Sequence, residues 1–159
     1  MTTRTTDRID KQILLRAPRA RVWKAITDSQ EFGDWFQTKF NGPFIPGQSV
    51  RGRVTHPGYE HVSVDFVIER IEPERYFSYR WHPNAIDTSV DYSGEPMTLV
   101  EFTLEEKPEG TLLTVSESGF DGIPIERRAA ALKGNDSGWT GQIKAIEAWL
   151  RKHPVAPAR

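Results

Sequence analysis

Glu117 is the acidic residue whose place in the sequence says most about possible chemistry. It follows Leu113 and Val115 at intervals of two within residues 111–118, and this alternation of apolar and polar side chains predicts a β-strand. If the alternation continues, the Glu117 carboxylate points into the interior together with the two apolar side chains. An unpaired charge in that position costs several kcal/mol unless it has a partner.

Two interpretations of Glu117 follow from this position. In the first, Tyr79 or Trp81 donates a hydrogen bond to the carboxylate, which becomes a polar anchor in an apolar pocket. In the second, the strand frays or bulges near Ser116 and leaves Glu117 exposed at the rim of the sheet. The sequence leaves both interpretations open.

Aromatic residues recur at positions that we expect to face the interior. They either line a cavity for a small molecule or fill a solid core, which aromatic side chains do more often. The eight aromatic candidates are Trp35, Phe36, Phe66, Phe77, Tyr79, Trp81, Phe102 and Trp139. Together with Glu117 and Ile143, they form the predicted ligand-binding set.

The histidines give a weaker signal. His56 and His61 lie five residues apart around a Pro-Gly turn, and because the chain has no cysteine and no HExxH pattern, they favour a surface turn over a metal site. His82 with Asp87 or Asp91 could form an acid/base pair, although the solvated end of a loop is the commoner arrangement.

No motif for a nucleophile or a bound phosphate occurs in the sequence. Ser116 and Ser118 lie in SESGF, which is not the GxSxG turn of serine hydrolases, and neither GxGxxG nor GxxxxGK[ST] is present. Arg127 and Arg128 are interpreted as the solvent-facing side of a helix. We therefore predict no catalytic residue, no metal and no cofactor.

A helix over residues 136–152 is expected to hold these side chains in place. Apolar residues recur there at steps of four, three and four, which puts them on one face, while Lys144, Glu147 and Arg151 fall on the other. The apolar face consists of Trp139, Ile143, Ile146 and Leu150.

The start of this helix is predicted from its capping residues. Asp136 or Ser137 is expected to accept hydrogen bonds from the first free backbone N–H groups. Gly134-Asn135 is expected to break the chain between this helix and a helical segment over residues 124–133.

Upstream of residue 124 the sequence predicts an antiparallel sheet. Period-two patterns and turn residues place strands near residues 9–16, 50–55, 61–69, 76–82, 98–106 and 111–118, with short helices near 18–27 and 28–36. Residues 83–96 are expected to form a long loop. Consecutive strands joined by tight turns form a meander that buries one face, so the predicted fold class is α+β, with about six strands and a long C-terminal helix over that face.

Composition excludes several classes of protein. The 159 residues suit one domain, and a formal net charge of −1 with no Lys/Arg run argues against a nucleic-acid partner. The absence of cysteine fits a reducing cytoplasm, and no apolar run approaches the roughly 18 residues of a membrane span. We therefore expect a cytoplasmic protein that does not insert into membranes.

Three short motifs occur in a characteristic order. Ala17-Pro18 is followed by RVWKAITD and then by Phe32 and Trp35, IEPER precedes YRW within residues 71–81, and Gly138-Trp139 opens the amphipathic helix. In this order and spacing, over residues 9–152, they resemble the START-like helix-grip superfamily. More narrowly, they resemble the branch named for homology to the activator of the heat shock protein ninety ATPase.

This resemblance implies a curved antiparallel sheet gripping the long helix, with a cavity between them, in a single domain spanning residues 1–159. Members of the superfamily bind lipids, sterols, polyketides or other apolar molecules, and a few are cyclases. The expected function is therefore non-enzymatic binding of a small hydrophobic or amphipathic molecule, by a monomer or weak homodimer. Glutamate at position 117 departs from the family, which often carries histidine near there.

Two alternatives remain from other classes. The first is a co-chaperone that stimulates the ATPase of a heat shock chaperone through its surface. The second is a cyclase or hydrolase that uses Glu117 or His82 as a base.

Overall fold

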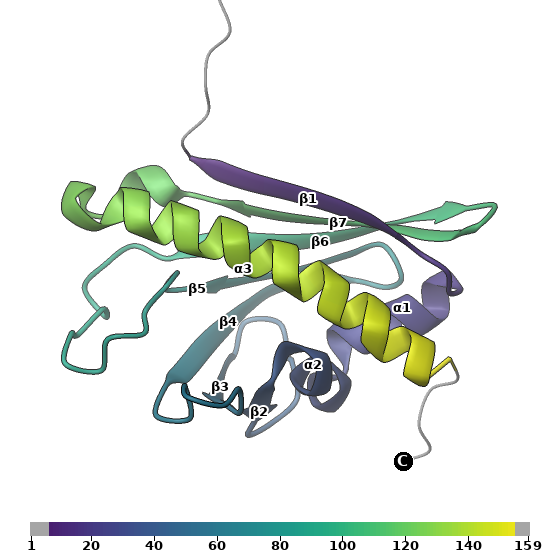
Figure 1. Ribbon diagram of the computed structural model, residues 1–159, viewed down its shortest axis with the longest axis horizontal. Helices are drawn as coiled ribbons and strands as arrows, with labels where there is room; N and C mark the ends of the chain where they lie inside the picture. The colour runs from purple at the N-terminus through teal and green to yellow at the C-terminus, as the bar shows by residue number, and fades with distance from the viewer. Residues whose placement is uncertain (1–6, 155–159) are drawn as a thin grey trace, which may run out of the picture.

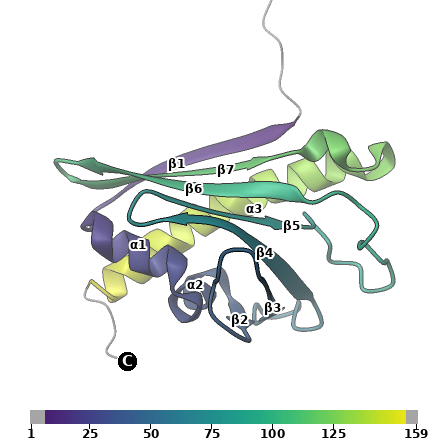
Figure 2. The same cartoon turned by 180° about the vertical axis from the view of Figure 1, so that it is seen from behind.

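One antiparallel sheet and one long helix make up most of the fold in the computed structural model, which describes residues 7–154. The elements are β1 (Arg8–Leu15), α1 (Arg19–Thr27), α2 (Ser29–Phe36), β2 (Thr38–Phe40), β3 (Ser49–Val54), β4 (Ser63–Glu72), β5 (Tyr76–Trp81), β6 (Thr98–Lys107), β7 (Gly110–Ser118), the 3₁₀ turn η1 (Phe120–Gly122) and α3 (Ile125–Lys152). Helix α3 runs diagonally across one face of the curved sheet (Figure 1). In the reverse view, the sheet lies in front of α3 (Figure 2). The predicted α+β helix-grip class is confirmed.

The seven strands are ordered β1-β7-β6-β5-β4-β3-β2, and every neighbouring pair is antiparallel. Strands β2 to β7 follow one another along the chain, as a meander requires, and β1 closes the order beside β7. The six predicted strands are present. The seventh, β2, was not predicted because its three residues are too few to display a period of two.

Alternation along the central strands places apolar side chains on the face of the sheet that α3 crosses. Phe66, Phe77, Phe102 and Val115, one from each of β4 to β7, are essentially inaccessible to solvent. Burial of such apolar side chains between the sheet and the helices supplies the main favourable free energy of the fold.

Helix α2 begins as its sequence predicts. The Asp28 carboxylate accepts hydrogen bonds from the backbone N–H groups of Gln30 and Glu31, at 2.9 and 3.3 Å. Gly33, which lowers the intrinsic helix propensity, is required by packing, because a Cβ there would lie 2.2 Å from the Thr38 carbonyl oxygen.

The predicted start of the C-terminal helix is wrong. Helix α3 is continuous for 28 residues from Ile125, with Pro124 at its N-cap, so Asp136 and Ser137 lie inside it. Gly134-Asn135 does not break it, because tertiary contacts outweigh the local propensity: the Asn84 side chain lies against Gly134, and the Asn135 amide binds Glu117.

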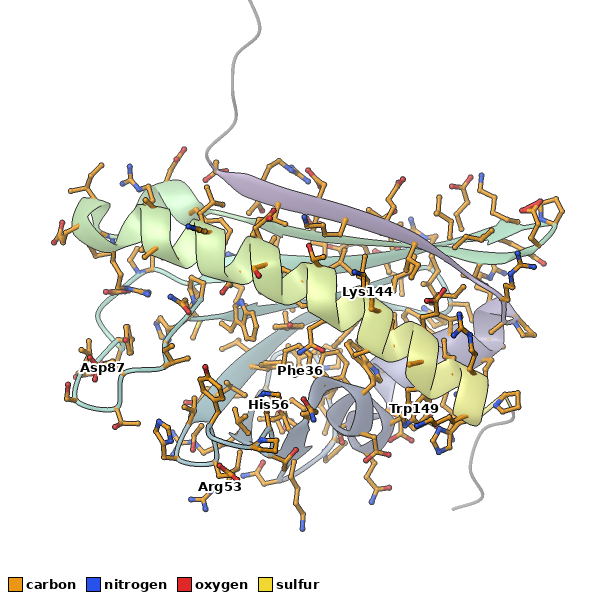
Figure 3. All side chains as sticks on the ribbon, in the orientation of Figure 1. Phe36, Arg53, His56, Asp87, Lys144 and Trp149 are labelled. Atoms are coloured by element: carbon orange, nitrogen blue, oxygen red, sulfur yellow. The ribbon has the colours of Figure 1, made fainter. Side chains whose placement is uncertain are left out.

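The predicted apolar face of α3 is correct but incomplete. Trp139, Ile146 and Leu150 are buried and Ile143 is half-buried, as expected. Trp149 extends the same face toward the C-terminal end. On the opposite side, Lys144 is exposed (Figure 3).

Candidate functional site

The Glu117 carboxylate is completely buried between the sheet and α3. From the sheet, Trp81 Nε1 donates to its Oε2 at 2.8 Å and Thr98 Oγ1 at 2.5 Å. From α3, Asn135 Nδ2 donates at 2.9 and 3.1 Å to the two oxygens, and Trp139 Nε1 donates to Oε1 at 2.8 Å. Four neutral donors therefore surround the carboxylate.

Regular strand pairing places the Glu117 side chain between the sheet and α3. It lies opposite Ile9 of β1 and Val100 of β6, and the register of β7 is uninterrupted on both sides. The bulge near Ser116 that would have exposed Glu117 is absent from these pairings. Ser116 instead points to the other face and donates to Asp10 at 2.6 Å.

Tyr79 shares a row of the sheet with Glu117, because both pair with Val100 of β6. Its hydroxyl is fully buried and has no hydrogen-bond partner in residues 7–154. Burial, and to a smaller extent the charge of Glu117, raise the pKa of Tyr79 well above its ordinary value of 10.0. The hydroxyl is therefore a protonated donor with nothing to donate to. Of the two predicted partners of Glu117, Trp81 is one and Tyr79 is not.

The predicted aromatic set is a connected cluster of rings. The Phe66 and Tyr79 rings stack at 3.9 Å and 7°, the edge of Trp81 meets Phe66 at 5.5 Å, and Trp139 lies 6.0 Å from both Trp81 and Phe36. Phe77 lies at the far side of this cluster, 5.9 Å from Phe102. Most of the space between sheet and helix is thus filled by side chains.

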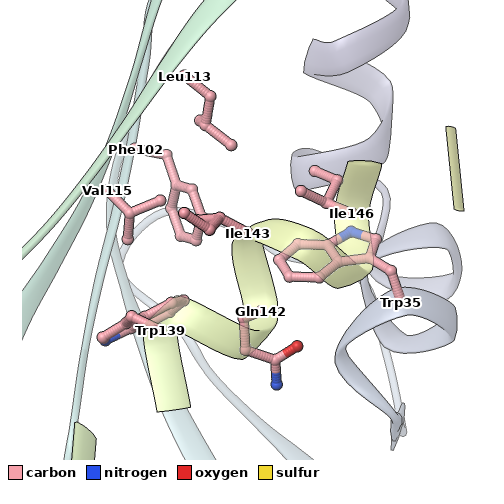
Figure 4. Close-up of a pocket in the computed structure, with 8 residues that line it drawn as sticks. All are labelled: Trp35, Phe102, Leu113, Val115, Trp139, Gln142, Ile143 and Ile146. Atoms are coloured by element: carbon pink, nitrogen blue, oxygen red, sulfur yellow. The ribbon is translucent and has the colours of Figure 1, made fainter. Parts of the chain in front are cut away.

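One apolar crevice remains beneath α3, next to this cluster (Figure 4). Its total unfilled volume is about 150 Å³, which includes the part that opens to solvent, and no enclosed part of it would hold a water molecule. Its walls come from α2, β6, β7 and α3. The lining residues are Trp35, Phe102, Leu113, Val115, Trp139, Gln142, Ile143 and Ile146.

Four of the ten predicted ligand-binding residues line the crevice: Trp35, Phe102, Trp139 and Ile143. Trp81 and Glu117 lie beyond Trp139 in the polar cluster, whereas Phe36, Phe66, Phe77 and Tyr79 are packed among other rings. Sequence reasoning missed Thr98 and Asn135 as partners of Glu117. Thr98 was detectable because it continues the inward alternation of Val100 and Phe102, whereas Asn135 was assigned to a helix break.

Arg127 binds the loop over residues 83–96. The prediction that Arg127 only faces solvent is therefore wrong. The Arg127 guanidinium donates to both Glu95 carboxylate oxygens, at 2.8 to 3.3 Å, and to the Pro83 and Asn84 carbonyl oxygens. It also lies 4.8 Å from the centre of the Tyr92 ring. Trp81 and Thr98 flank this loop, and both donate to Glu117. Arg127 and Glu117 therefore both hold the ends of the loop in place.

His56 and His61 lie at the surface, as predicted, whereas His82 is half-buried. His56 is exposed and contacts Gln37 Oε1 at 2.7 Å, and His61 is also exposed. His82 Nε2 contacts the Glu95 carbonyl oxygen at 3.0 Å, while Asp87 lies at the outer part of the loop (Figure 3). Within residues 7–154 no group of three or more His, Cys, Asp or Glu is arranged to hold a metal.

Comparisons with known proteins agree with this architecture. Protein MLL2253 from Mesorhizobium loti has 22% identity and a TM-score of 0.71, over 92% of this chain and 98% of its own. The Aha1 dimer from Colwellia psychrerythraea has 15% identity and a TM-score of 0.66, over 88% and 92%. DynU16, from the dynemicin biosynthetic locus, has 24% identity and a TM-score of 0.70 over 91% of this chain and 47% of its own. No curated protein matched the sequence.

The fold and the buried site define a START-like helix-grip protein. The model of the family described as Activator of Hsp90 ATPase homolog 1-like protein matches residues 16–151, and the chain belongs to this family. In residues 7–154, no helix has the length and apolar character needed to cross a membrane.

Proposed function

We propose that this protein binds a small apolar or amphipathic molecule between the sheet and α3, and that it does so without catalysing a reaction. The ligand would enter at the crevice, contact its aromatic and aliphatic walls, and orient itself by the buried polar groups beyond Trp139. Family membership supports this general class of function, and the local chemistry supports the site.

The observation that carries the proposal is the unpartnered hydroxyl of Tyr79. Buried polar groups are nearly always hydrogen-bonded, and an exception calls for an explanation. A core with only a structural role would favour phenylalanine at position 79, because removing the hydroxyl removes its desolvation cost. A ligand with a hydrogen-bond acceptor would supply the missing partner.

Binding requires the interior to rearrange, since the crevice is smaller than the roughly 300–1,000 Å³ of typical ligand sites. The segment of α3 over the site is suited to this. It carries Gly134, Gly138 and Gly141 within eight residues, and glycine weakens a helix interior by about 1 kcal/mol relative to alanine. Apart from the adjacent residues and backbone of α3 itself, no atom lies within 4 Å of a Cβ added at Gly138 or Gly141, so packing does not require glycine at either position.

The tryptophan side chains allow a direct test by NMR, because each of the five indole N–H groups gives its own signal. Titration with long-chain alcohols, sterols and planar aromatic compounds should shift the Trp35, Trp81 and Trp139 signals. The signals of Trp23 and Trp149 should move little, because these residues neither line the crevice nor donate to Glu117. Shifts confined to Trp23 and Trp149, or none with any compound, would overturn the proposal.

Two consecutive residues that point in different directions from α3 provide a matched pair of variants. Ile143 lines the crevice and Lys144 is exposed. Ile143→Phe should fill the crevice and weaken binding at least tenfold, whereas Lys144→Phe should leave the affinity unchanged. Equal effects of the two substitutions would count against binding in the crevice.

Stimulation of a chaperone ATPase is a second candidate, suggested by the description of the family and by the likeness to the Colwellia psychrerythraea Aha1 dimer. An ATPase assay with the host's heat shock chaperone tests it. Stimulation that survives Ile143→Phe and is lost on surface substitutions would favour this candidate over small-molecule binding.

A cyclase or hydrolase with Glu117 as its base has less support. Both carboxylate oxygens already accept hydrogen bonds from Trp81, Thr98, Asn135 and Trp139, and a general base needs a free lone pair facing its substrate. If a measured turnover were abolished by Glu117→Gln in a protein that still folds, the cyclase or hydrolase hypothesis would be supported.

A further inference from the structure

The four side chains that donate hydrogen bonds to Glu117 form two sets, and the two sets differ in how easily they separate from the Glu117 carboxylate. Trp81 and Thr98 belong to β5 and β6, two neighbouring strands of the same sheet as Glu117. Asn135 and Trp139 belong to the glycine-containing segment of α3. Movement of α3 away from the sheet therefore breaks the second set and leaves the first in place.

Trp139 stands between the crevice and Glu117. Its ring lines the crevice, and its Nε1 donates to Glu117 Oε1 at 2.8 Å. Figure 4 shows that nitrogen turned away from the other lining side chains. A ligand too large for the crevice gains space toward the cluster by displacing Trp139, and this displacement uncovers a carboxylate that has lost a donor.

The uncovered carboxylate sets a chemical requirement on the ligand. Within residues 7–154, Glu117 forms no ion pair, so neutral hydrogen bonds are what balance its charge. When a buried charge loses a hydrogen-bond donor, the free-energy cost of its desolvation is no longer offset. A negatively charged ligand would add electrostatic repulsion, which is strong in a medium of low dielectric constant. A ligand O–H or N–H group restores the lost hydrogen bond, whereas a carboxylate cannot.

We infer that the ligand is an apolar molecule carrying a neutral hydroxyl or N–H group that donates to Glu117 in place of Trp139, and that the site discriminates against carboxylates such as fatty acids. This inference rests on the proposed function. Glu117 is thus the residue that determines ligand specificity, with Tyr79 available to donate to an acceptor on the same ligand.

Three probes with one naphthalene body and different head groups test the inference: 2-naphthol, 2-methylnaphthalene and 2-naphthoate. Affinities for the full chain are measured by isothermal titration calorimetry at neutral pH, with the tryptophan indole signals locating each probe. We expect 2-naphthol to bind at least tenfold more tightly than either of the others. Equal affinities for all three would overturn the inference while leaving the proposed function intact, and a lack of binding by all three compounds and by the earlier panel would overturn both.

Two substitutions assign the preference to the cluster. Trp139→Phe keeps an apolar ring but removes the N–H donor, so the preference for 2-naphthol over 2-methylnaphthalene should increase severalfold. Glu117→Gln removes the charge, so discrimination against 2-naphthoate should fall to less than threefold, while Glu105→Gln on the exposed side of β6 should change nothing. Discrimination that persists unchanged in Glu117→Gln would overturn the assignment, and if that variant fails to fold, the Trp139→Phe result decides.

Discussion

Glu117 is a charged side chain in a part of the interior that is built largely of aromatic rings. Its position is tolerated because Trp81, Thr98, Asn135 and Trp139 together satisfy both oxygens. Hydrogen bonds to charged groups stabilise a protein more than neutral ones do, and an unmet partner costs the full desolvation of that group. The cluster therefore both fastens α3 to the sheet and makes the fold sensitive to one residue.

Glu117→Gln should lower the free energy of unfolding by about 3 kcal/mol, because the amide cannot accept at both positions and its own N–H₂ faces other donors. Urea unfolding measures the change. Glu105→Gln, at an exposed position on β6, is the control and should stay within about 0.5 kcal/mol of the parent protein. A loss no larger than that of the control would mean that the four hydrogen bonds contribute little to stability.

Tyr79→Phe should leave stability at neutral pH unchanged or raise it by up to about 1 kcal/mol, since it deletes a buried hydroxyl without a partner. Tyr76→Phe is the matched comparison. It removes a hydrogen bond of 2.6 Å from Tyr76 to Glu101, so this variant should be less stable than the parent. The reverse order of stabilities would show that the Tyr79 hydroxyl has a stabilising partner.

The raised pKa of Tyr79 also predicts a dependence of stability on pH. In the unfolded chain this hydroxyl loses its proton near pH 10, while in the folded protein it keeps the proton to higher pH. Its contribution is therefore fully present below pH 10 and is lost as the pH rises above that value, because the unfolded state then binds fewer protons. Chemical unfolding at several alkaline pH values should show a smaller loss for Tyr79→Phe than for the parent.

At the scale of elements, α3 combines a strongly anchored apolar face with a weak segment above the site. Gly138 and Gly141 have open space around the position of a Cβ, whereas a Cβ at Gly134 would lie 3.2 Å from the Asn84 side chain. The glycines thus lower the cost of distorting the helix close to where Asn135 and Trp139 hold Glu117.

Gly138→Ala and Gly141→Ala should each stabilise the protein by about 1 kcal/mol, because alanine has the higher helix propensity and restricts the unfolded chain. Gly134→Ala should gain less, since Asn84 has to move. Urea unfolding gives the stabilities, and the double variant should bind ligand more slowly in stopped-flow experiments if helix distortion admits the ligand. An unchanged association rate in a stabilised double variant would place the entry route elsewhere.

At the scale of the whole molecule, polar contacts along α3 attach it to the rest of the fold in addition to its apolar face. Lys11 of β1 forms a partly exposed ion pair with Asp136 at 3.1 Å, and Glu117 holds the middle of the helix. At the C-terminal end, Arg21 of α1 donates to the His153 carbonyl oxygen at 2.9 Å and forms a buried ion pair with Glu31 at 2.8 Å. Its guanidinium also lies 4.9 Å from the centre of the Trp149 ring.

These attachments should differ greatly in energy. Arg21→Ala should lower the free energy of unfolding by about 3 kcal/mol, because it removes the buried ion pair with Glu31 at 2.8 Å. Lys11→Ala should cost no more than about 0.5 kcal/mol, because its ion pair is partly exposed to solvent. Thermal and urea unfolding of both variants check the difference, and comparable losses would contradict it.

The sequence by itself determined those features that depend on the periodicity of a single segment. The six longer strands, the two short helices and the apolar face of α3 all follow from spacings of two or of three to four residues. The resemblance of residues 9–152 to the helix-grip superfamily added their arrangement, and the family match agrees with it.

Only the tertiary structure decided which residues from distant segments of the chain contact one another. It showed that α3 continues through Gly134-Asn135, that Arg127 fastens the 83–96 loop, and that Thr98 and Asn135 join Trp81 and Trp139 around one carboxylate. It also showed that aromatic rings fill most of the space beneath the helix and leave a small crevice. These facts depend on contacts between residues far apart in the chain, and a local pattern carries no information about which of its neighbours will meet there.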